Sequence, residues 1–376
     1  MSRRFPAQLL VTPKEVKRFV IDCMAVIGTE TKHGGALADT LVAADTKGHY
    51  SHGLNRLEMY IKEVKTKACD GNATPTIVKE TSSTAFVDAR NGLGSVAGVF
   101  CMQLAIKKAR KAGIGWITCT HSNHYGIAGF YSQMATRSGL VGMSMTNASP
   151  LMMPTRGKKR VLGTNPIAFG APGLHGDEFM LDMSTTTVAE GKVEVNHRKQ
   201  IPIPTGWAVD KDGKDTTSTS EYNDGGMLLP LGGREETSGY KGYGLATMVD
   251  VLCGVMSGGR FKERIRKWSS SEESSLGTPS ESQEYIVTRK AHMFMALDPS
   301  VFINDFPSRM SGLMSDLRNQ QPAVPDKPVL VAGDPERIQE KLVEQNGSIT
   351  YHVSIINAMD QVADNLDVEK MERTSK

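Results

Sequence analysis

Three side chains that can carry out proton transfer and carboxylate binding fall within the six residues from Ser51 to Arg56. A hydroxyl and an imidazole are adjacent at Ser51 and His52, and the guanidinium of Arg56 follows four residues after the imidazole. A carboxylate held by Arg56 would lie near an imidazole that can exchange a proton. These groups suit the oxidation of a 2-hydroxy acid or the reduction of a 2-keto acid. The alternative is an ordinary helix start followed by a solvated arginine.

This segment lies between two runs of residues that predict helices. Gly48 predicts the end of the first helix, and Ser51 predicts the N-cap of the second. On the second helix Arg56 and Tyr60 are four residues apart and share a face. His52 would lie in the first turn, where Arg56 and the helix N-terminus both disfavour the imidazolium and lower the pKa of the ring.

Apolar periodicity predicts helices and strands along most of the chain. Helices are expected between residues 13 and 66 and over 96–112, 130–138, 243–256, 306–319 and 336–345. Strands are expected over 85–88, 114–119, 140–145 and 292–297, with mainly sheet from 161 to 210. The Ser/Glu-rich stretch 262–284 predicts an exposed loop insertion.

Composition excludes several classes of protein. The chain has 376 residues, enough for two domains, and its 39% apolar and 23% charged residues are typical of a globular protein. A net charge of +3 is too small to indicate a nucleic-acid or membrane-surface partner, and no apolar run approaches the roughly 20 residues of a membrane span. Five widely spaced cysteines predict reduced thiols in a cytoplasmic protein rather than disulfides or a zinc site.

Two further segments follow predicted strands. Gly92, Gly94 and Gly98 open a helix, but their spacing departs from a dinucleotide-binding fingerprint, and the next strand ends without an acidic residue for a ribose. We therefore expect close packing there rather than a Rossmann fold. His121 and His124 are three residues apart in a polar loop, but no third ligand at a recognisable spacing supports a metal site. His124 is instead a candidate proton or amide contact above a cleft.

Three polar segments are suited to binding phosphate or amide groups. The turns at 162–166 and 181–186 offer backbone N–H groups and short hydroxyls, and Lys241 lies among glycines at a helix start. Taken alone, the first two are better interpreted as ordinary turns, and Lys241 is equally a solvated surface lysine.

Together these segments resemble the type-2 malate/L-lactate dehydrogenase family, which includes ureidoglycolate, sulfolactate and piperideine-2-carboxylate oxidoreductases. The resemblance keeps the family's order and runs from about Val11 to about Asn346. It is carried by SHGLNRLEMY (51–60), SNHYGIAGFY (122–131), LGTNPIAFGAPG (162–173), LDMSTTTVAEGKV (181–193), GWAVD (206–210), LPLGG (229–233), GYKGYGLATMVD (239–250), ALDP (296–299) and GDPE (333–336).

The resemblance implies an α+β, non-Rossmann fold of the malate/L-sulfolactate dehydrogenase type and a homodimer. Residues 1–120 and 235–376 would form a discontinuous, largely helical domain for substrate binding and dimerisation. Residues 121–234 would form an α+β cofactor-binding domain between them.

The family's functional positions transfer to this sequence residue by residue. Its catalytic positions match Ser51, His52, His124 and Lys192, the last being Asp in some members. Its substrate contacts match Arg56, for the carboxylate, and Tyr60. Its contacts to NAD or NADP match Thr164, Asp182, Met183, Ser184, Lys241, Gly333, Asp334 and Pro335. No metal is implied.

The chain departs from the family pattern at a few positions. Lys47 stands where Arg is common, His49 and Tyr50 replace smaller residues, and residues 347–350 differ from the usual Gly-Ile-Pro. None of these removes a catalytic position, but they leave the substrate open.

The sequence thus predicts a NAD(P)-dependent 2-hydroxyacid dehydrogenase acting on malate or L-lactate, with either His52 or His124 as the main base. One alternative is reduction of a cyclic imino acid such as piperideine-2-carboxylate. Another is a catalytically silent homologue with a binding role. A Ser/His hydrolase is disfavoured, because adjacent Ser51 and His52 should point in different directions and no G-x-S-x-G motif is present.

Overall fold

The computed structural model of the chain describes residues 8–259 and 290–375, so the predicted insertion at 262–284 lies outside the described residues. The helices are α1 (Pro13–Val26), α2 (Thr31–Thr46), α3 (Leu57–Lys65), α4 (Gly94–Ala112), α5 (Ala128–Thr136), α6 (Glu190–Arg198), α7 (Thr219–Asn223), α8 (Gly239–Asp250), α9 (Phe306–Arg318), α10 (Asp334–Asn346) and α11 (Val353–Leu366). The strands are β1 (Gln8–Val11), β2 (Thr76–Glu80), β3 (Thr84–Asp88), β4 (Ile114–Ser122), β5 (Val141–Thr146), β6 (Ile167–Pro172), β7 (Glu178–Met183), β8 (Ala208–Val209), β9 (Asp215–Thr216), β10 (Met227–Leu228), β11 (Lys290–Leu297), β12 (Ile349–His352) and β13 (Thr374–Ser375).

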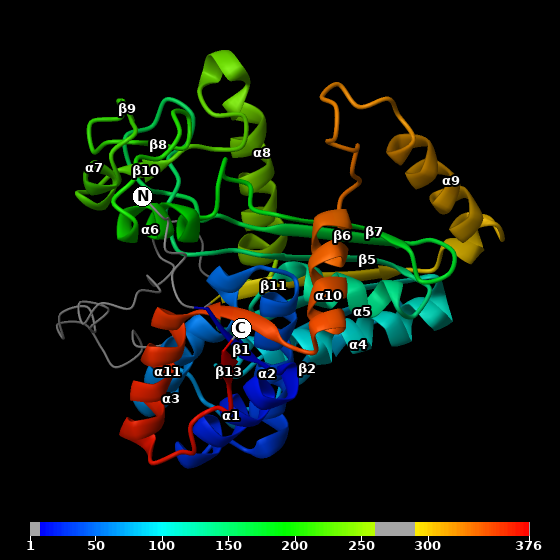
Figure 1. Ribbon diagram of the computed structural model, residues 1–376. Helices are drawn as coiled ribbons and strands as arrows, with labels where there is room; N and C mark the ends of the chain where they lie inside the picture. Colours follow the sequence, from blue (N-terminus) through cyan, green and yellow to red (C-terminus); the bar gives the residue numbers. More distant parts are fainter. Residues whose placement is uncertain (1–7, 260–289, 376) are drawn as a thin grey trace.

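A mixed sheet runs through the middle of the molecule in the order β2-β3-β4-β11-β5-β6-β7 (Figure 1). Strands β3 and β4 are parallel, and the other neighbours are antiparallel. Strand β11 comes from the C-terminal third of the chain and lies between β4 and β5. A Rossmann sheet is built from successive parallel strands with helical crossovers, so this topology confirms the predicted non-Rossmann α+β fold.

Strand β11 is buried on both faces and joins two layers of helices. One face packs against α8 and the turn that follows it, through Ala291, Met293 and Met295. The other face packs toward α4 and α5, through Phe294 and Ala296. Successive side chains of a strand point to opposite faces, so one strand holds both layers against the sheet.

The two ends of the chain share a hydrophobic core. Helices α1, α2 and α3 pack with α11, and β1 pairs with both β12 and β13 (Figure 1). Phe19, Leu41 and Leu57 meet Tyr351 and Met359 in this core. The large sheet takes strands from both sides of the boundary expected near residue 120, and the proposed domain limits stay a prediction.

Between β7 and α8 the chain forms a small sheet, β10-β8-β9, with α6 and α7 beside it (Figure 1). The expectation of mainly sheet from 161 to 210 is wrong at Glu190–Arg198, which forms α6. This helix buries Gly191 and Val193 and is otherwise largely polar. Its sequence therefore carries little of the apolar period that identifies a helix.

No helix in 8–259 or 290–375 is long and apolar enough to cross a membrane. The same residues hold no group of His, Cys, Asp and Glu side chains suited to a metal ion. All five cysteines are buried, and none is in a disulfide.

Candidate active site

The turn at residues 47–56 sets the geometry of the site. Gly48 follows α2 with a φ of +81°, so the predicted helix end is confirmed. The chain then forms two 3₁₀ turns, Tyr50–His52 and Leu54–Arg56, before α3 begins at Leu57. Ser51 is therefore not an N-cap, and the expected position of His52 in the first turn of an α-helix is wrong.

Asp45 explains why the chain does not continue as an α-helix. Its Oδ2 accepts hydrogen bonds from the N–H of Leu54 at 2.9 Å and from the hydroxyl of Tyr351 at 2.6 Å. Burial raises the pKa of Asp45 to about 7, against the two hydrogen bonds, which lower it. A Cβ at Gly53 would lie 1.7 Å from Asp45 Oδ1, so a glycine is required between the two 3₁₀ turns.

Two imidazoles stack beside this turn. The ring centroids of His52 and His124 are 5.8 Å apart, and the ring planes differ by 25°. Ser51 Oγ lies 2.9 Å from His52 Nδ1, so the expectation that these adjacent side chains diverge is wrong. The tight 3₁₀ turn brings them together, and the hydroxyl orients the imidazole.

Hydrogen bonds determine the tautomer of His124. Its Nδ1 lies 2.6 Å from the hydroxyl of Tyr60 and 3.3 Å from the backbone nitrogen of Gly126. A backbone N–H can only donate, so Nδ1 accepts, and the neutral ring carries its proton on Nε2.

A Cβ at Gly94 would lie 2.3 Å from the carbonyl oxygen of His124. The close packing predicted for the glycine-rich start of α4 is therefore confirmed.

Burial lowers the pKa of both imidazoles. The pKa of His52 falls to about 3, first through burial and then through the charges of Arg56, His49 and Lys290. The pKa of His124 falls well below its usual range, first through burial and then through Lys290 and His52. The predicted direction for His52 is confirmed, but desolvation rather than a helix terminus is the main cause. Both rings are neutral at pH 7.

Arg56 lies at the start of α3, and its side chain is 17% exposed. Its Nε donates to the carbonyl oxygen of Ser51 at 2.6 Å, and a terminal nitrogen lies 3.3 Å from Glu194 Oε2. These contacts hold the guanidinium at the wall of the site. Arg56 and Tyr60, predicted to share a helix face, both reach the same group of side chains.

The side chains of His52, Arg56 and His124 line one cavity of about 240 Å³. Its wall contains His52, Arg56, His124, Ala148, Ser149, Pro150, Leu151, Arg160, Thr164, Ala189, Glu190, Gly191, Glu194 and Lys290. Three of these residues are cationic and two are carboxylic acids. Burial, followed by the charge of Glu194, raises the pKa of Glu190. The cavity therefore has an excess of positive charge and suits an anion.

Four residues of the cavity wall had no role expected from the sequence: Arg160, Glu190, Glu194 and Lys290. Glu190 lies within a matched segment and Arg160 and Glu194 lie just outside one, but their residue types carry no signal of their own. Lys290 precedes the strand predicted at 292–297 by two residues. A lysine at the end of a strand is usually exposed to solvent, so it gave no indication of a buried site.

The helix that sequence analysis missed closes one side of the cavity. A Cβ at Gly191, in the first turn of α6, would lie 2.8 Å from Ser51 Cβ and 3.9 Å from the guanidinium of Arg56. The next residue, Lys192, is exposed and does not line the cavity. Its role in a Ser-His relay stays a prediction.

Asp182 and Gly333 line a separate, much smaller pocket, and one predicted cofactor residue lies in the wall of the candidate active-site cavity. Thr164 lines it, and the Thr164 carbonyl accepts hydrogen bonds from the N–H of Thr185 at 2.8 Å and from its hydroxyl at 3.0 Å. Asp182, near the end of β7, accepts a backbone hydrogen bond at 2.7 Å, and burial raises its pKa. Met183 and Ser184 follow and are half-buried.

Gly333, Asp334 and Pro335 form the start of α10, which packs on β7. A Cβ at Gly333 would lie 2.9 Å from the Cβ of a β7 methionine. The Asp334 carboxylate forms ion pairs with Arg318 and Arg337. Burial opposes its ionisation, but hydrogen bonds from these arginines and a backbone N–H lower its pKa to about 2. Asp334 thus ties α9 to α10, and its contact with a cofactor stays a prediction.

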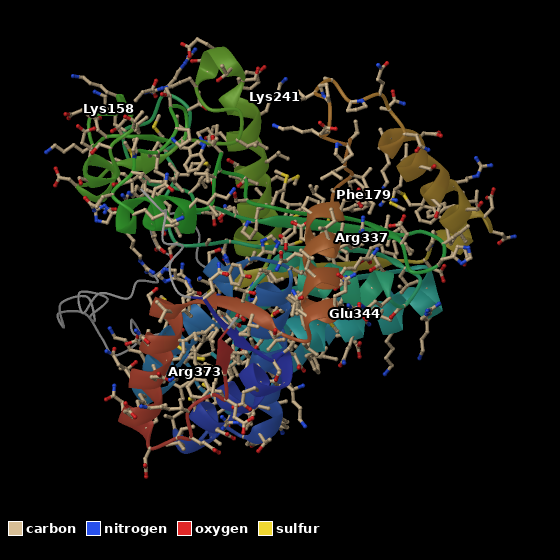
Figure 2. The ribbon with its side chains drawn as sticks, in the orientation of Figure 1. Lys158, Phe179, Lys241, Arg337, Glu344 and Arg373 are labelled. Carbon is tan, nitrogen blue, oxygen red and sulfur yellow. The ribbon has the colours of Figure 1, made fainter. Side chains whose placement is uncertain are left out.

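Lys241 lies in the first turn of α8, so its predicted place at a helix start is confirmed. Figure 2 shows it at the upper end of α8, apart from Arg337 on α10. The side chain is exposed. The adjacent Gly242 packs against Leu231, whose N–H donates to the carbonyl of Thr185 at 2.9 Å. Backbone contacts thus connect Lys241 to the Thr164 region, and its contact with a phosphate stays a prediction.

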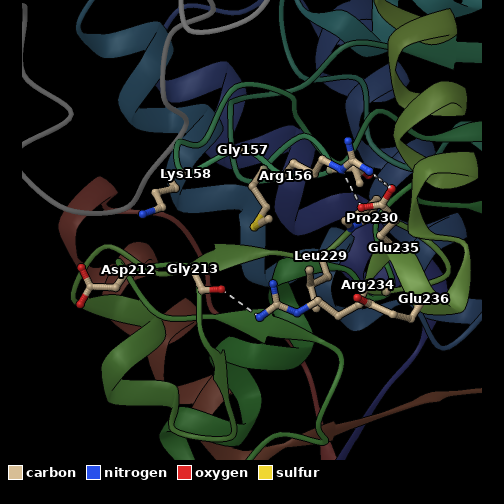
Figure 3. A pocket seen from close by; sticks show the side chains of 13 residues that line it. Arg156, Gly157, Lys158, Asp212, Gly213, Leu229, Pro230, Arg234, Glu235 and Glu236 are labelled. Carbon is tan, nitrogen blue, oxygen red and sulfur yellow. Dashed lines mark hydrogen bonds and ion pairs between the residues drawn. The ribbon is translucent and has the colours of Figure 1, made fainter.

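A second cavity, also of about 240 Å³, lies near Arg156 (Figure 3). Arg156 forms a two-point ion pair with Glu235, at 2.6 and 2.7 Å, and Arg234 donates to the carbonyl of Gly213 at 2.9 Å. The described residues that line this cavity include no histidine and none of the predicted site residues.

Comparisons with known proteins identify the family of the chain. The family model for malate/L-lactate dehydrogenase matches residues 11–360. A malate dehydrogenase from Pyrococcus abyssi is 41% identical over 310 residues, which cover 82% of this chain and 81% of the relative. A malate/(S)-sulfolactate dehydrogenase from Methanothermus fervidus is 34% identical and covers 96% of this chain and 99% of its own length.

Solved structures share the fold. A malate dehydrogenase from Entamoeba histolytica matches with a TM-score of 0.88 and 29% identity, over 96% of this chain and 99% of that one. A malate dehydrogenase from Pyrococcus horikoshii OT3 gives 0.85 and 32%, over 99% and 100%. The predicted class of enzyme, a dehydrogenase for hydroxy acids, is thereby confirmed. The chain belongs to the malate/L-lactate dehydrogenase family of oxidoreductases.

Proposed function

We propose that this protein transfers a hydride between C2 of a small 2-hydroxy acid and NAD or NADP, with malate as the first substrate and L-lactate as the second. The observation that carries the proposal is the single cavity shared by Arg56 and the stacked rings of His52 and His124. A guanidinium for the carboxylate and an imidazole for the adjacent hydroxyl proton are what a 2-hydroxy acid requires. Relatives named malate and sulfolactate dehydrogenase support an acidic substrate.

The hydrogen bonds of the two imidazoles favour different roles. Because Nδ1 of His124 accepts from Tyr60 and Gly126, its Nε2–H is a donor, suited to the substrate oxygen at C2. Nδ1 of His52 lies against the Ser51 hydroxyl, which can accept its proton in a hydrogen bond and leave Nε2 free as a base. His52 would therefore take the hydroxyl proton during oxidation, and His124 would stabilise the forming carbonyl.

The low pKa of His52 is compatible with this role. In the free protein, burial and nearby cations keep the ring neutral, as a base must start. A substrate carboxylate on Arg56 would offset one of those positive charges and raise the pKa of His52. Substrate binding would thus strengthen the base at the moment it is needed.

The residues around Thr164 fit a nicotinamide dinucleotide. Thr164 lies in the wall of the cavity, Thr185 donates hydrogen bonds to its carbonyl and so links it to the segment 182–184, and Lys241 lies in the first turn of α8. When bound, NAD or NADP would accept or return the hydride. Thr164, Asp182 and Ser184 would hold it near the cavity, and Lys241 would pair with a phosphate.

The resemblance to the family also supports a cytoplasmic homodimer whose discontinuous helical domain carries the dimer contact. Light scattering would test the assembly, with an expected mass twice that of the 40.8 kDa chain. A mass of one chain would remove the dimer from the proposal.

A panel of reductions tests the function. The purified protein is mixed with oxaloacetate, pyruvate, other 2-keto acids or piperideine-2-carboxylate, each with NADH and with NADPH, and nicotinamide absorbance is followed. Fastest turnover of oxaloacetate would support malate, and the better of the two nucleotides would identify the cofactor. Turnover confined to piperideine-2-carboxylate would replace the proposal with the cyclic imino acid alternative. A folded protein that oxidises neither nucleotide with any substrate would be the silent homologue.

A further inference from the structure

A buried lysine that the proposed function does not use lines the candidate active-site cavity. Lys290 is the first residue of β11, is 4% exposed, and pairs with Ser122 of β4. Between Lys290 and His292 the register shifts, because β4 has one residue more than β11, and His121 there has a φ of +52°. A bulge of this kind re-aims neighbouring side chains, and Lys290 here faces the same cavity as His52.

The two arginines of the cavity are held by other protein groups. Arg56 donates to a backbone carbonyl and to Glu194. Arg160 donates to two backbone carbonyls between residues 222 and 226 and lies 5.2 Å from the centroid of the Tyr222 ring. Arg56 is the guanidinium beside the histidine pair, so it is the one that suits the carboxylate next to the reacting carbon.

Among the described residues of the cavity wall, the cationic side chains outnumber the carboxylic acids. The wall has three cations and two carboxylic acids, and burial favours the neutral form of Glu190. A substrate with a second acidic group would therefore meet a further cation in this cavity of about 240 Å³. Lys290 lines the same cavity as His52 and His124, and its charge lowers the pKa of both rings, so the ammonium lies on the side of the cavity where the substrate would react.

We propose that Lys290 binds the second acidic group of the substrate, a carboxylate or a sulfonate attached to C3, and so selects dianionic 2-keto acids over pyruvate. The inference rests on the proposed function of this cavity. A compact ammonium with three donors can bind either acid, whereas the fork of Arg56 matches the planar carboxylate at C1. The two arms oxaloacetate and sulfopyruvate distinguish the two acids.

The test compares Lys290→Gln with the parent protein. Values of kcat/KM for reduction of oxaloacetate, sulfopyruvate and pyruvate are measured at one pH with the preferred nucleotide. Lys290→Arg keeps the charge, and Lys199→Gln removes a lysine charge from the exposed end of α6, away from the cavity. Any change in the pKa of His52 acts on every substrate and cancels in the ratio between two of them.

In Lys290→Gln, we expect kcat/KM for the preferred dianion to fall on the order of 100-fold, the scale for losing one partner of a buried charge pair. The value for pyruvate should change less than about threefold, which also shows that the variant is folded. Lys290→Arg should keep most of the selectivity, and Lys199→Gln all of it.

Two results would overturn the inference. Equal losses for dianions and pyruvate would place Lys290 in the chemistry common to all substrates. No loss for either class of substrate would remove it from substrate binding. A parent protein that reduces no 2-keto acid would instead reject the proposed function itself, so the two failures are distinguishable.

Discussion

The candidate active-site cavity and the cavity beside Arg156 have the same volume, about 240 Å³, and both are lined by cations and carboxylates. They differ in burial. The side chain of Arg156 is 79% exposed and paired with Glu235, and their hydrogen bond raises the pKa of the arginine and lowers that of the acid. In the candidate active-site cavity, desolvation is the leading cause of the pKa shifts. It lowers the pKa of His52 and His124 and so keeps both rings neutral. Volume and charge therefore do not distinguish the candidate active site from the other cavity, whereas buried titratable groups do.

The largest expected effect is that of His52→Gln. Loss of the base should lower kcat/KM for malate oxidation roughly 10²–10⁴-fold. In the parent, kcat/KM follows the ionisation of the free protein. Because the pKa of His52 is about 3 there, kcat/KM should be nearly independent of pH from pH 5 to pH 8. The check is a pH–rate profile of both proteins. If His124→Gln gives the larger loss, and His52→Gln keeps most of the activity, the proposed roles of the two rings are exchanged.

The two cavities offer a matched pair of arginines. Arg56→Lys keeps the charge but loses the two-pronged guanidinium, so KM for the preferred keto acid should rise roughly 10- to 100-fold. Arg156→Lys should leave KM unchanged, because its ion pair with Glu235 is exposed. Steady-state kinetics on both variants is the measurement. Similar KM values for the two would contradict the contrast between the cavities.

Acid should destabilise the fold through the buried imidazole of His292. His292 is fully buried between Ser122 and Thr146, and burial lowers its pKa to about 3. Its unfolded pKa is about 6.5, so the unfolded chain takes up the proton first and stability is lost as pH falls from about 6.5 toward 3. At pH 5 this loss is about 2 kcal/mol.

Urea unfolding at pH 7 and pH 5 would measure that loss. In His292→Gln the difference between the two pH values should shrink by about 2 kcal/mol. The buried Asp45, whose pKa is raised, acts in the opposite direction, but it is common to both proteins and cancels. An equal pH dependence in parent and variant would show that His292 is not neutral in the folded state.

The smallest expected effect concerns α6. In Gly191→Ala the new Cβ would meet Ser51 at 2.8 Å, and overpacking of about 1–3 kcal/mol should push α6 from the turn and lower kcat/KM about tenfold. Gly244→Ala in α8 is the matched control, since nothing lies within 4 Å of its Cβ, and it should gain about 0.5–1 kcal/mol in stability. Kinetics and thermal melting on both variants would check this. Full activity in Gly191→Ala would mean that α6 does not shape the site.

The sequence predicted the reactive groups better than the geometry that joins them. Ser51, His52 and Arg56 lie in one local motif, and the period of the flanking helices and strands is strong enough to predict most elements. The two 3₁₀ turns were not predictable, because they depend on Asp45 and on a tyrosine 306 residues further along the chain. Helix α6 was missed because packing against the turn, rather than its own apolar pattern, stabilises it.

The contacts in the cavity follow the same rule. Lys290 reaches it through a bulge between strands that are far apart in sequence, and neither residue type nor spacing encodes that pairing. The meeting of His124 with His52 came from the family resemblance alone, since 72 positions separate them and no local pattern joins them.

The hydrogen bond between Asp45 and Tyr351 has a consequence for biosynthesis. Tyr351 lies on β12, which pairs with β1 from the other end of the chain. During synthesis, Tyr351 therefore leaves the ribosome long after His52. The turn at residues 47–56 has to wait for this tyrosine, which supports it through Asp45. A nascent or shortened chain that ends before residue 351 contains the reactive side chains without the contact that fixes their backbone. Turnover should thus begin only when the late-synthesised strand β12 docks.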